Sequence, residues 1–200
     1  MLKLMAEKAG LKQHYSSLEY NIEKAANTEY PLRSYPLLFF SYCFIGWIWE
    51  FALFLVLQNK VLNNGFFHGP WLPIYGIGGM MAIILFKNIR NNPLKVFFSM
   101  MIAAGILEYT THALTELVYG VTWWDYSDYM FNINDRVCLE ALAVFGILGC
   151  FSIYFIAPRL NRLIMKISAQ KQDVIIYVLA VLFILDVLVS LSSPNMENIY

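Results

Sequence analysis

The stretch MMIAAGILEYTTHALTELVYG, residues 100–120, is long and apolar enough to cross a membrane as one helix, yet it carries two glutamates and a histidine. A helix needs about 20 mostly apolar residues to cross the hydrocarbon core. Glu108, His112 and Glu116 follow one another at intervals of four residues, which places them on one face of a helix. Such a stripe is unsuited to lipid, so we expect it to face the interior of a helical bundle or a water-filled cavity.

The composition of the whole chain supports a membrane protein. Of its 200 residues, 59% are hydrophobic and 14% are charged, whereas soluble domains carry about 25% charged residues. The formal net charge of zero gives no reason to expect nucleic acid as a partner. The three cysteines lie in apolar runs without CxxC spacing, so they indicate neither a disulfide framework nor a zinc site. We expect no cofactor.

Five apolar stretches predict an all-α membrane protein, a bundle of about five transmembrane helices. They cover residues 37–57, 71–87, 96–119, 137–157 and 174–193, and the second is short and rich in glycine. Residues 1–36 read as a cytoplasmic leader with apolar residues near helical spacing. This leader is expected to be an amphipathic surface helix, a contact for a partner, or a plain solvated helix. Residues 37–193 form the membrane domain and residues 194–200 a short external tail.

The basic residues predict the orientation of the chain. With five spans, every lysine and arginine except Lys60 and Arg136 falls on one side of the membrane. Basic residues are retained on the cytoplasmic side. The N-terminus is therefore expected inside the cell and the C-terminus outside, in a multi-pass protein of the bacterial plasma membrane.

Two unusual segments then share the outer face. The first, NNGFFHGPWLPIYGIGG (63–79), concentrates prolines and glycines before a predicted helix whose positive dipole end would point at acidic groups or an anionic ligand. The second, YGVTWWDYSDYMFNINDR (119–136), is either an aromatic belt at headgroup level or a lid over a pocket. Their candidate structural residues are His68, Gly69, Pro70, Pro73, Tyr75, Gly76, Trp124, Asp125 and Asn132.

The candidate site consists of ionisable residues predicted at similar depth near that face. They are Glu50, Glu108, His112, Glu116, Arg136 and Glu140. One interpretation is structural, in which these groups pair with one another, for instance Arg136 with Glu108 or Glu140. The second is a polar pocket, open to the outside, that binds a substrate or relays protons. A third is a metal site formed by Glu108, His112 and Glu116, although no HExxH motif supports it and we assign no metal.

Several of these motifs together resemble a family of small bacterial membrane proteins of the type IV ABC-transporter class, found mainly in Firmicutes. The resemblance rests on GWIWE, GFFHGPWLPIYGIGG, LEY and WWDYS followed by FNIN-x-R-x-CL, and it runs from about residue 37 to about residue 157. It implies a multi-pass protein with a role in transport. Asp135 stands where the family usually has glycine. The matching residues are Glu50, Gly69, Pro70, Pro73, Tyr75, Gly76, Glu108, Trp124, Asp125, Tyr126, Ser127, Asn132 and Arg136.

Three functions remain open at this point. The first is a transport component, permease-like or substrate-capturing. The chain lacks the G-x-x-x-x-G-K-[ST] motif that cradles ATP phosphates, so an ATPase would be a separate subunit. Five spans are few for a complete pathway, which favours a homo-oligomer such as a dimer, or a partner subunit. The second is a membrane-embedded enzyme acting on a lipid or envelope precursor, with Glu108 and His112 as acid and base, although no catalytic motif is present. The third is a non-catalytic sensor or assembly factor.

Overall fold

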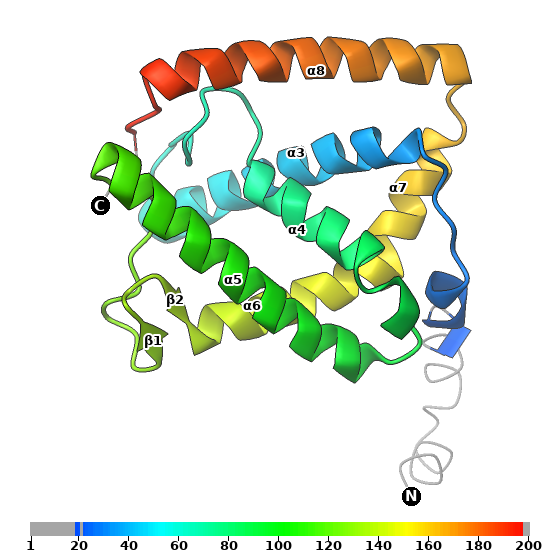
Figure 1. Ribbon diagram of the computed structural model, residues 1–200, viewed down its shortest axis with the longest axis horizontal. Helices are drawn as coiled ribbons and strands as arrows, with labels where there is room; N and C mark the ends of the chain where they lie inside the picture. The colour runs from blue at the N-terminus through cyan, green and yellow to red at the C-terminus, as the bar shows by residue number, and fades with distance from the viewer. Residues whose placement is uncertain (1–18, 21, 198–200) are drawn as a thin grey trace, which may run out of the picture.

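The computed structural model describes residues 19–20 and 22–197, so most of the predicted leader (1–18 and 21) and the last residues of the tail (198–200) lie outside the described residues. The described chain is almost entirely helical (Figure 1). Its sheet is one antiparallel pair of two-residue strands, β1 (Asn132–Ile133) and β2 (Val137–Cys138).

Four stretches of helix are long and apolar enough to cross a membrane. They are Ser34–Val56 within α3 (Ser34–Gln58), all of α5 (Pro93–Tyr119), Leu139–Ile164, and all of α8 (Ala169–Ser192). They coincide with four of the five predicted spans. Large apolar side chains on their outer faces are exposed in the monomer, as expected for surfaces in contact with lipid.

The second predicted span, residues 71–87, contains a shorter helix than expected. The helix α4 (Pro73–Ile84) has twelve residues, which rise only about 18 Å. It begins at Pro73, where the missing N–H costs nothing because the first turn has no partner for it. After Ile84 the chain continues through a turn and the short 3-10 helix η1 (Lys87–Ile89). The structure therefore has a short apolar helix where the sequence predicted the second span.

The third long stretch is continuous but contains one π-helical turn between two α-helices. The helix α6 (Leu139–Phe151) runs into a π-helical turn, η2 (Ser152–Ile156), and then into α7 (Ala157–Ile164). Pro158, in the first turn of α7, cannot donate the hydrogen bond of an α-helix, and an inserted π turn is one way to absorb that loss. The turn also places Ser152 against Tyr42 of α3, with their hydroxyl oxygens 2.6 Å apart.

One end of the bundle, which we call the basic end, joins the N-terminal segment to the start of α5. Arg90 is buried, and its guanidinium donates to the backbone carbonyls of Ala25, Thr28 and Ile83. Ala25 lies in an apolar cluster with side chains of α4, α5 and η2. The helical segment 22–26 thus packs into this end of the bundle rather than lying apart on a surface.

The opposite end, which we call the loop end, brings together residues 59–72, 120–138 and 193–197. Asn195 donates through its side chain to the carbonyls of Asn63 and Gly65, at 2.5 and 3.0 Å. Trp123 donates from its indole to the carbonyl of Asn195. Lys60 and Arg136 are the two basic residues at this end of the described chain. The tail is therefore part of the fold and holds the two long connections together.

The helices α3 and α4 pack closely because glycines line their contact. A Cβ atom added to Gly76 would lie 2.5 Å from the Cys43 sulfur, and one added to Gly79 would lie 2.5 Å from the Tyr42 ring. On α3, the Tyr75 ring lies against Gly46 in the same way. Small residues allow this approach between membrane helices, and it fixes the position of Tyr75 beside the acidic residues described below.

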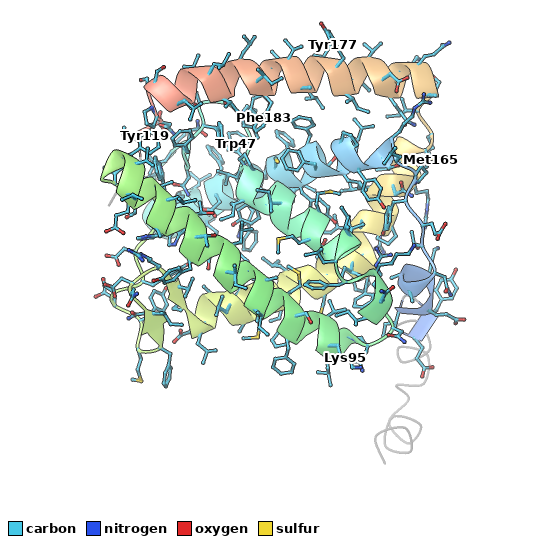
Figure 2. The ribbon with its side chains drawn as sticks, viewed as in Figure 1. Trp47, Lys95, Tyr119, Met165, Tyr177 and Phe183 are labelled. Carbon is cyan, nitrogen blue, oxygen red and sulfur yellow. The ribbon has the colours of Figure 1, made fainter. Side chains whose placement is uncertain are left out.

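The last helix, α8, lies at the edge of the molecule (Figure 1). Figure 2 shows Phe183 pointing from α8 toward the bundle and Tyr177 pointing away from it. Phe183 makes edge or tilted ring contacts with Phe39, Phe40, Phe67 and Trp71. At the basic end, Asp173 pairs with Arg33 at 3.3 Å. The helix is thus anchored by a few contacts, while its outer face is free to meet lipid.

Candidate functional site

The polar stripe of α5 faces inward. Glu108 and His112 are each 6% exposed, whereas Ile102 and Leu117 on other faces are 66% and 81% exposed. The spacing of the stripe therefore predicts its direction correctly. Glu116, one turn closer to the loop end, is exposed, so the stripe runs from the buried interior to the surface.

Glu50 of α3 meets the start of α4. The Tyr75 hydroxyl donates to one carboxylate oxygen of Glu50 at 2.6 Å, and the Asn64 side chain donates to the other at 2.8 Å. Glu50 is half-buried. Both of its oxygens therefore have a neutral donor, which is what a carboxylate within a membrane protein requires. The glycine contacts of α3 and α4 bring Tyr75 to this position.

Glu108 of α5 interacts electrostatically with Glu50 of α3. The Tyr126 hydroxyl, from the 120–138 connection, donates to Oε1 of Glu108 at 3.2 Å. Burial raises the pKa of Tyr126 above its usual range, and Glu108 raises it further, so this hydroxyl stays protonated and remains a donor. The second oxygen, Oε2, is buried and has no hydrogen-bond partner among the described residues.

His112 lies one turn along α5 from Glu108. Its ring meets the Trp124 ring edge-on, with the centroids 5.6 Å apart. Its Nδ1 atom is buried without a hydrogen-bond partner in the part of the chain that the structure describes. The nearest acid is Glu116, whose Oε2 lies 3.8 Å from Nδ1, which is too long for a hydrogen bond. Two neighbouring buried groups on α5 thus each have one polar atom unsatisfied.

Arg136 contacts a different acid from those that the sequence suggested. Its guanidinium donates to Glu116 at 2.8 Å and to the Tyr109 hydroxyl at 3.1 Å, and it lies over the Tyr109 ring at 5.0 Å. The hydrogen bond to Glu116 raises the pKa of Arg136, so the guanidinium stays charged. Glu140 is exposed in the first turn of α6. Arg136 therefore pairs at the surface end of the stripe, and the buried part has no basic partner among the described residues.

The loop that precedes α4 is held by an acid of α8. Asp186 accepts hydrogen bonds from the backbone N–H groups of His68 and Gly69, from the Trp71 indole and from the Ser190 hydroxyl, at 2.6 to 3.2 Å. The His68 ring lies 2.8 Å from the carbonyl oxygen of Ser193. His68 and Pro70 are exposed. These residues build the loop, and Asp186, recognisable as an acid within an apolar span, is its principal anchor.

The connection from residue 120 to residue 138 covers the buried groups of α5. Tyr126 and Trp124 contact Glu108 and His112, as described above. Asp125 accepts hydrogen bonds from the backbone N–H and the hydroxyl of Ser127, which fixes a tight turn. Asn132 accepts from the backbone N–H of Asp135, whose φ of 59° is left-handed. That backbone conformation suits the glycine that the family usually has at this position, and aspartate tolerates it better than most residues.

The acids do not gather into a metal site within the described chain. No three His, Cys, Asp or Glu side chains there converge on a common point. The Glu116 carboxylate, one member of the set considered from the sequence, is engaged by Arg136. Two open grooves of about 400 and 230 Å³ lie elsewhere, one along the start of α5 and the other between α3 and α4 on an apolar face.

The comparisons with known proteins agree with this picture of a membrane protein. No curated protein and no solved structure matches the chain. The family described as "Putative ABC-transporter type IV" matches residues 37–191, which include most of α3 and α8 and all the elements between them. Together with four helices able to span a membrane, this match shows that the chain is an ABC-transporter-type membrane protein and belongs to that family.

Proposed function

We propose that the protein is the membrane component of a transport system and that it works through a group of side chains beneath the loop end. This group, which we call the α5 site, consists of Glu50, Tyr75, Glu108, His112 and Tyr126. It takes one residue from α3, one from α4, two from α5 and one from the connection that covers them. In this proposal the site binds the transported solute or passes on a proton that drives its movement.

The observation that carries the proposal is the unsatisfied state of Glu108. A group kept only to join helices is expected to have all its hydrogen bonds made within the protein, as Asp186 has. Glu108 is buried, yet one of its two oxygens has no partner among the described residues, and the same holds for Nδ1 of His112. Buried ionisable groups of this kind mark substrate or proton pathways in membrane proteins.

The other charged candidates have structural roles in this proposal. Arg136 and Glu116 pair at the surface and hold the connection to α5. Glu140 stabilises the start of α6 by placing a negative charge near a helix N-terminus. Of the three interpretations of the ionisable residues, pairing thus suits Arg136 and Glu116, and a functional site suits Glu108 and His112.

The distribution of basic residues supports the loop end as the outer face. Outside Lys60 and Arg136, the described lysines and arginines belong to the basic end or the helix turns next to it. A separate ATPase subunit would then dock at the basic end in the cytoplasm of the bacterial cell. A second copy of the chain or another membrane subunit would complete the pathway, because so few membrane helices enclose little space.

The test compares cells that lack the chain with cells complemented by wild type, Glu108→Gln or Glu140→Gln. Solutes inside the cells and in the medium are measured without preselection. We expect a restricted set of solutes to change its distribution when the chain is absent. Wild type and Glu140→Gln should restore that distribution, whereas Glu108→Gln should not, at equal abundance of each protein in the membrane.

Two results would contradict the proposal. One is a solute distribution that does not depend on the chain at all. The other is full restoration by Glu108→Gln, which would leave transport intact and remove the role given to the α5 site. The Glu140 variant serves as the matched control because it makes the same change of charge and shape at an exposed acid near the same end.

A further inference from the structure

The unsatisfied atoms of the α5 site have a shared chemical character. Glu108 Oε2 accepts hydrogen bonds, and Nδ1 of a neutral histidine accepts one when the proton is on Nε2. The donors nearby are already in use, since the Tyr75 hydroxyl donates to Glu50 and the Tyr126 hydroxyl donates to Glu108. A group that satisfies the site must therefore bring donors of its own, and at least two of them.

The charges around the site favour a cation. Glu50 and Glu108 lie near each other, and Glu116 lies 3.8 Å from His112 on the other side. Arg136, the basic side chain at the surface end of the stripe, already pairs with Glu116 at 2.8 Å. Burying a carboxylate without a compensating charge is costly, so a positively charged group between Glu108 and His112 lowers the energy of the site.

The surrounding side chains favour an organic cation over a metal ion. Aromatic rings attract cations to their faces, and the Trp124 and Tyr126 side chains of the covering connection contact His112 and Glu108. An alkali or alkaline-earth ion instead needs about six oxygen ligands, while Glu108 offers one free oxygen. No metal-binding group of three acids, histidines or cysteines occurs in the described residues.

We infer that the α5 site binds a primary or secondary ammonium group, which donates to Glu108 Oε2 and to His112 Nδ1 beneath Trp124 and Tyr126. The inference rests on the proposed function and specifies the chemical class of its ligand. A soluble amine and the ethanolamine headgroup of a phospholipid carry the same group, and lipid nanodiscs of defined composition distinguish the two.

Binding is measured on the full chain purified in a detergent free of ethanolamine lipids. Thermal unfolding is followed as ethylammonium, ethanolamine, choline or sodium chloride is added at constant ionic strength. A ligand that binds the folded state raises the unfolding temperature in proportion to its affinity. We expect ethylammonium and ethanolamine to stabilise the wild type, and choline, which has no N–H group, and sodium to have at least tenfold weaker effects.

Variants locate the effect within the protein. Glu108→Gln removes the charged acceptor with little change in shape, and His112→Phe keeps a ring beside Trp124 but removes the nitrogen. Each should weaken ethylammonium binding at least tenfold, whereas Glu140→Gln should leave it unchanged. Equal stabilisation by choline or sodium, no stabilisation by either amine, or undiminished binding in both variants would overturn the inference. The salt comparison uses wild type alone, so it stands even where a variant unfolds.

Lipid nanodiscs then distinguish the two sources of the ammonium group. If the ligand is a lipid headgroup, the wild type should be more stable in phosphatidylethanolamine than in phosphatidylcholine, and Glu108→Gln should lose that difference. If the ligand is soluble, the two lipids should give equal stability and added ethanolamine should still stabilise the protein. The two proposals can fail separately. If no ammonium compound binds, but Glu108→Gln still fails to restore the solute distribution in cells, this inference is rejected and the proposed transport function stands.

Discussion

At the scale of single residues, the intramembrane acids differ in how completely the protein satisfies them. Asp186 accepts four hydrogen bonds and Glu50 accepts two, one on each oxygen. Glu108 accepts one, from Tyr126, and its other oxygen has no partner in the described chain. The cost of inserting a charged residue into a membrane is similar for each. The difference therefore separates acids that hold the fold from the acid that we assign to function.

The role of Asp186 predicts a loss of stability. Asp186→Ala leaves two backbone N–H groups and the Trp71 indole without their acceptor. We expect the free energy of unfolding in detergent to fall by roughly 2–4 kcal/mol, because each unsatisfied buried donor costs about 1–3 kcal/mol and some of them regain water. Thermal unfolding measures the loss. Glu140→Ala removes an exposed acid from the first turn of α6 and should lower the stability by less than about 1 kcal/mol. An equal effect of the two substitutions would contradict the anchoring role.

Spacing along one helix revealed the inward direction of Glu108 and His112, because helical periodicity is a local property. The partners of these residues could not be read in the same way. Arg136 contacts Glu116 and not Glu108 or Glu140, since the choice depends on the path of the 120–138 connection through its hairpin and turns. Tyr126 reaches Glu108 because of the path of the same connection. A tyrosine in an aromatic-rich loop gives no signal of its own in the sequence.

At the scale of elements, the contact between α3 and α4 predicts a contrast among neighbouring glycines. Gly79→Ala places a methyl group against the buried Tyr42 ring, which cannot move because its hydroxyl contacts Ser152. We expect a loss of about 1–3 kcal/mol, typical of overpacking. Gly78→Ala meets no atom within 4 Å and should stabilise α4 by up to about 1 kcal/mol through helix propensity. Unfolding in detergent measures both, and equal effects would contradict the close packing of the two helices.

The tail element predicts a change confined to the loop end. Asn195 is 4% exposed, and its side chain donates to the carbonyls of Asn63 and Gly65. Asn195→Ala should increase amide hydrogen exchange in residues 59–72 and leave exchange at the basic end unchanged. Met196→Ala, which alters an exposed neighbour, is the control. Unchanged exchange in residues 59–72 of the Asn195 variant would show that the tail does not hold this loop.

Four of the predicted spans coincide with long helices, because apolar length alone determines them. The second span was predicted across residues 71–87 and contains a twelve-residue helix. A hydropathy count measures only how apolar a segment is. It does not detect the backbone turns on either side of that helix. The packing of Ala25 into the bundle was equally hidden, since it depends on Arg90, which is 65 residues further along the chain.

At the scale of the whole molecule, the chain passes repeatedly between a basic end and a loop end. This arrangement predicts where labels reach the protein. In a background without Cys43, Cys138 and Cys150, a cysteine at the exposed position Lys166 should react only with reagents that enter the cytoplasm. A cysteine at the exposed position Asp128 should react with impermeant reagents in intact cells. Labelling of position 166 from outside would show that the predicted orientation is wrong and that the α5 site lies in the cytoplasmic half of the membrane.

In the proposed function, Glu108 is retained to bind the solute or a proton and not to hold the helices together. The most direct test of this role is the membrane abundance of Glu108→Gln beside that of Glu108→Lys. The amide matches the acid in shape, and no basic partner of Glu108 occurs among the described residues, so the Gln variant should assemble at nearly wild-type abundance. The Lys variant places an unpaired cation in the bundle and should be strongly depleted. If Glu108→Gln is as depleted as Glu108→Lys, Glu108 is a structural partner within the bundle and does not have the proposed role in transport.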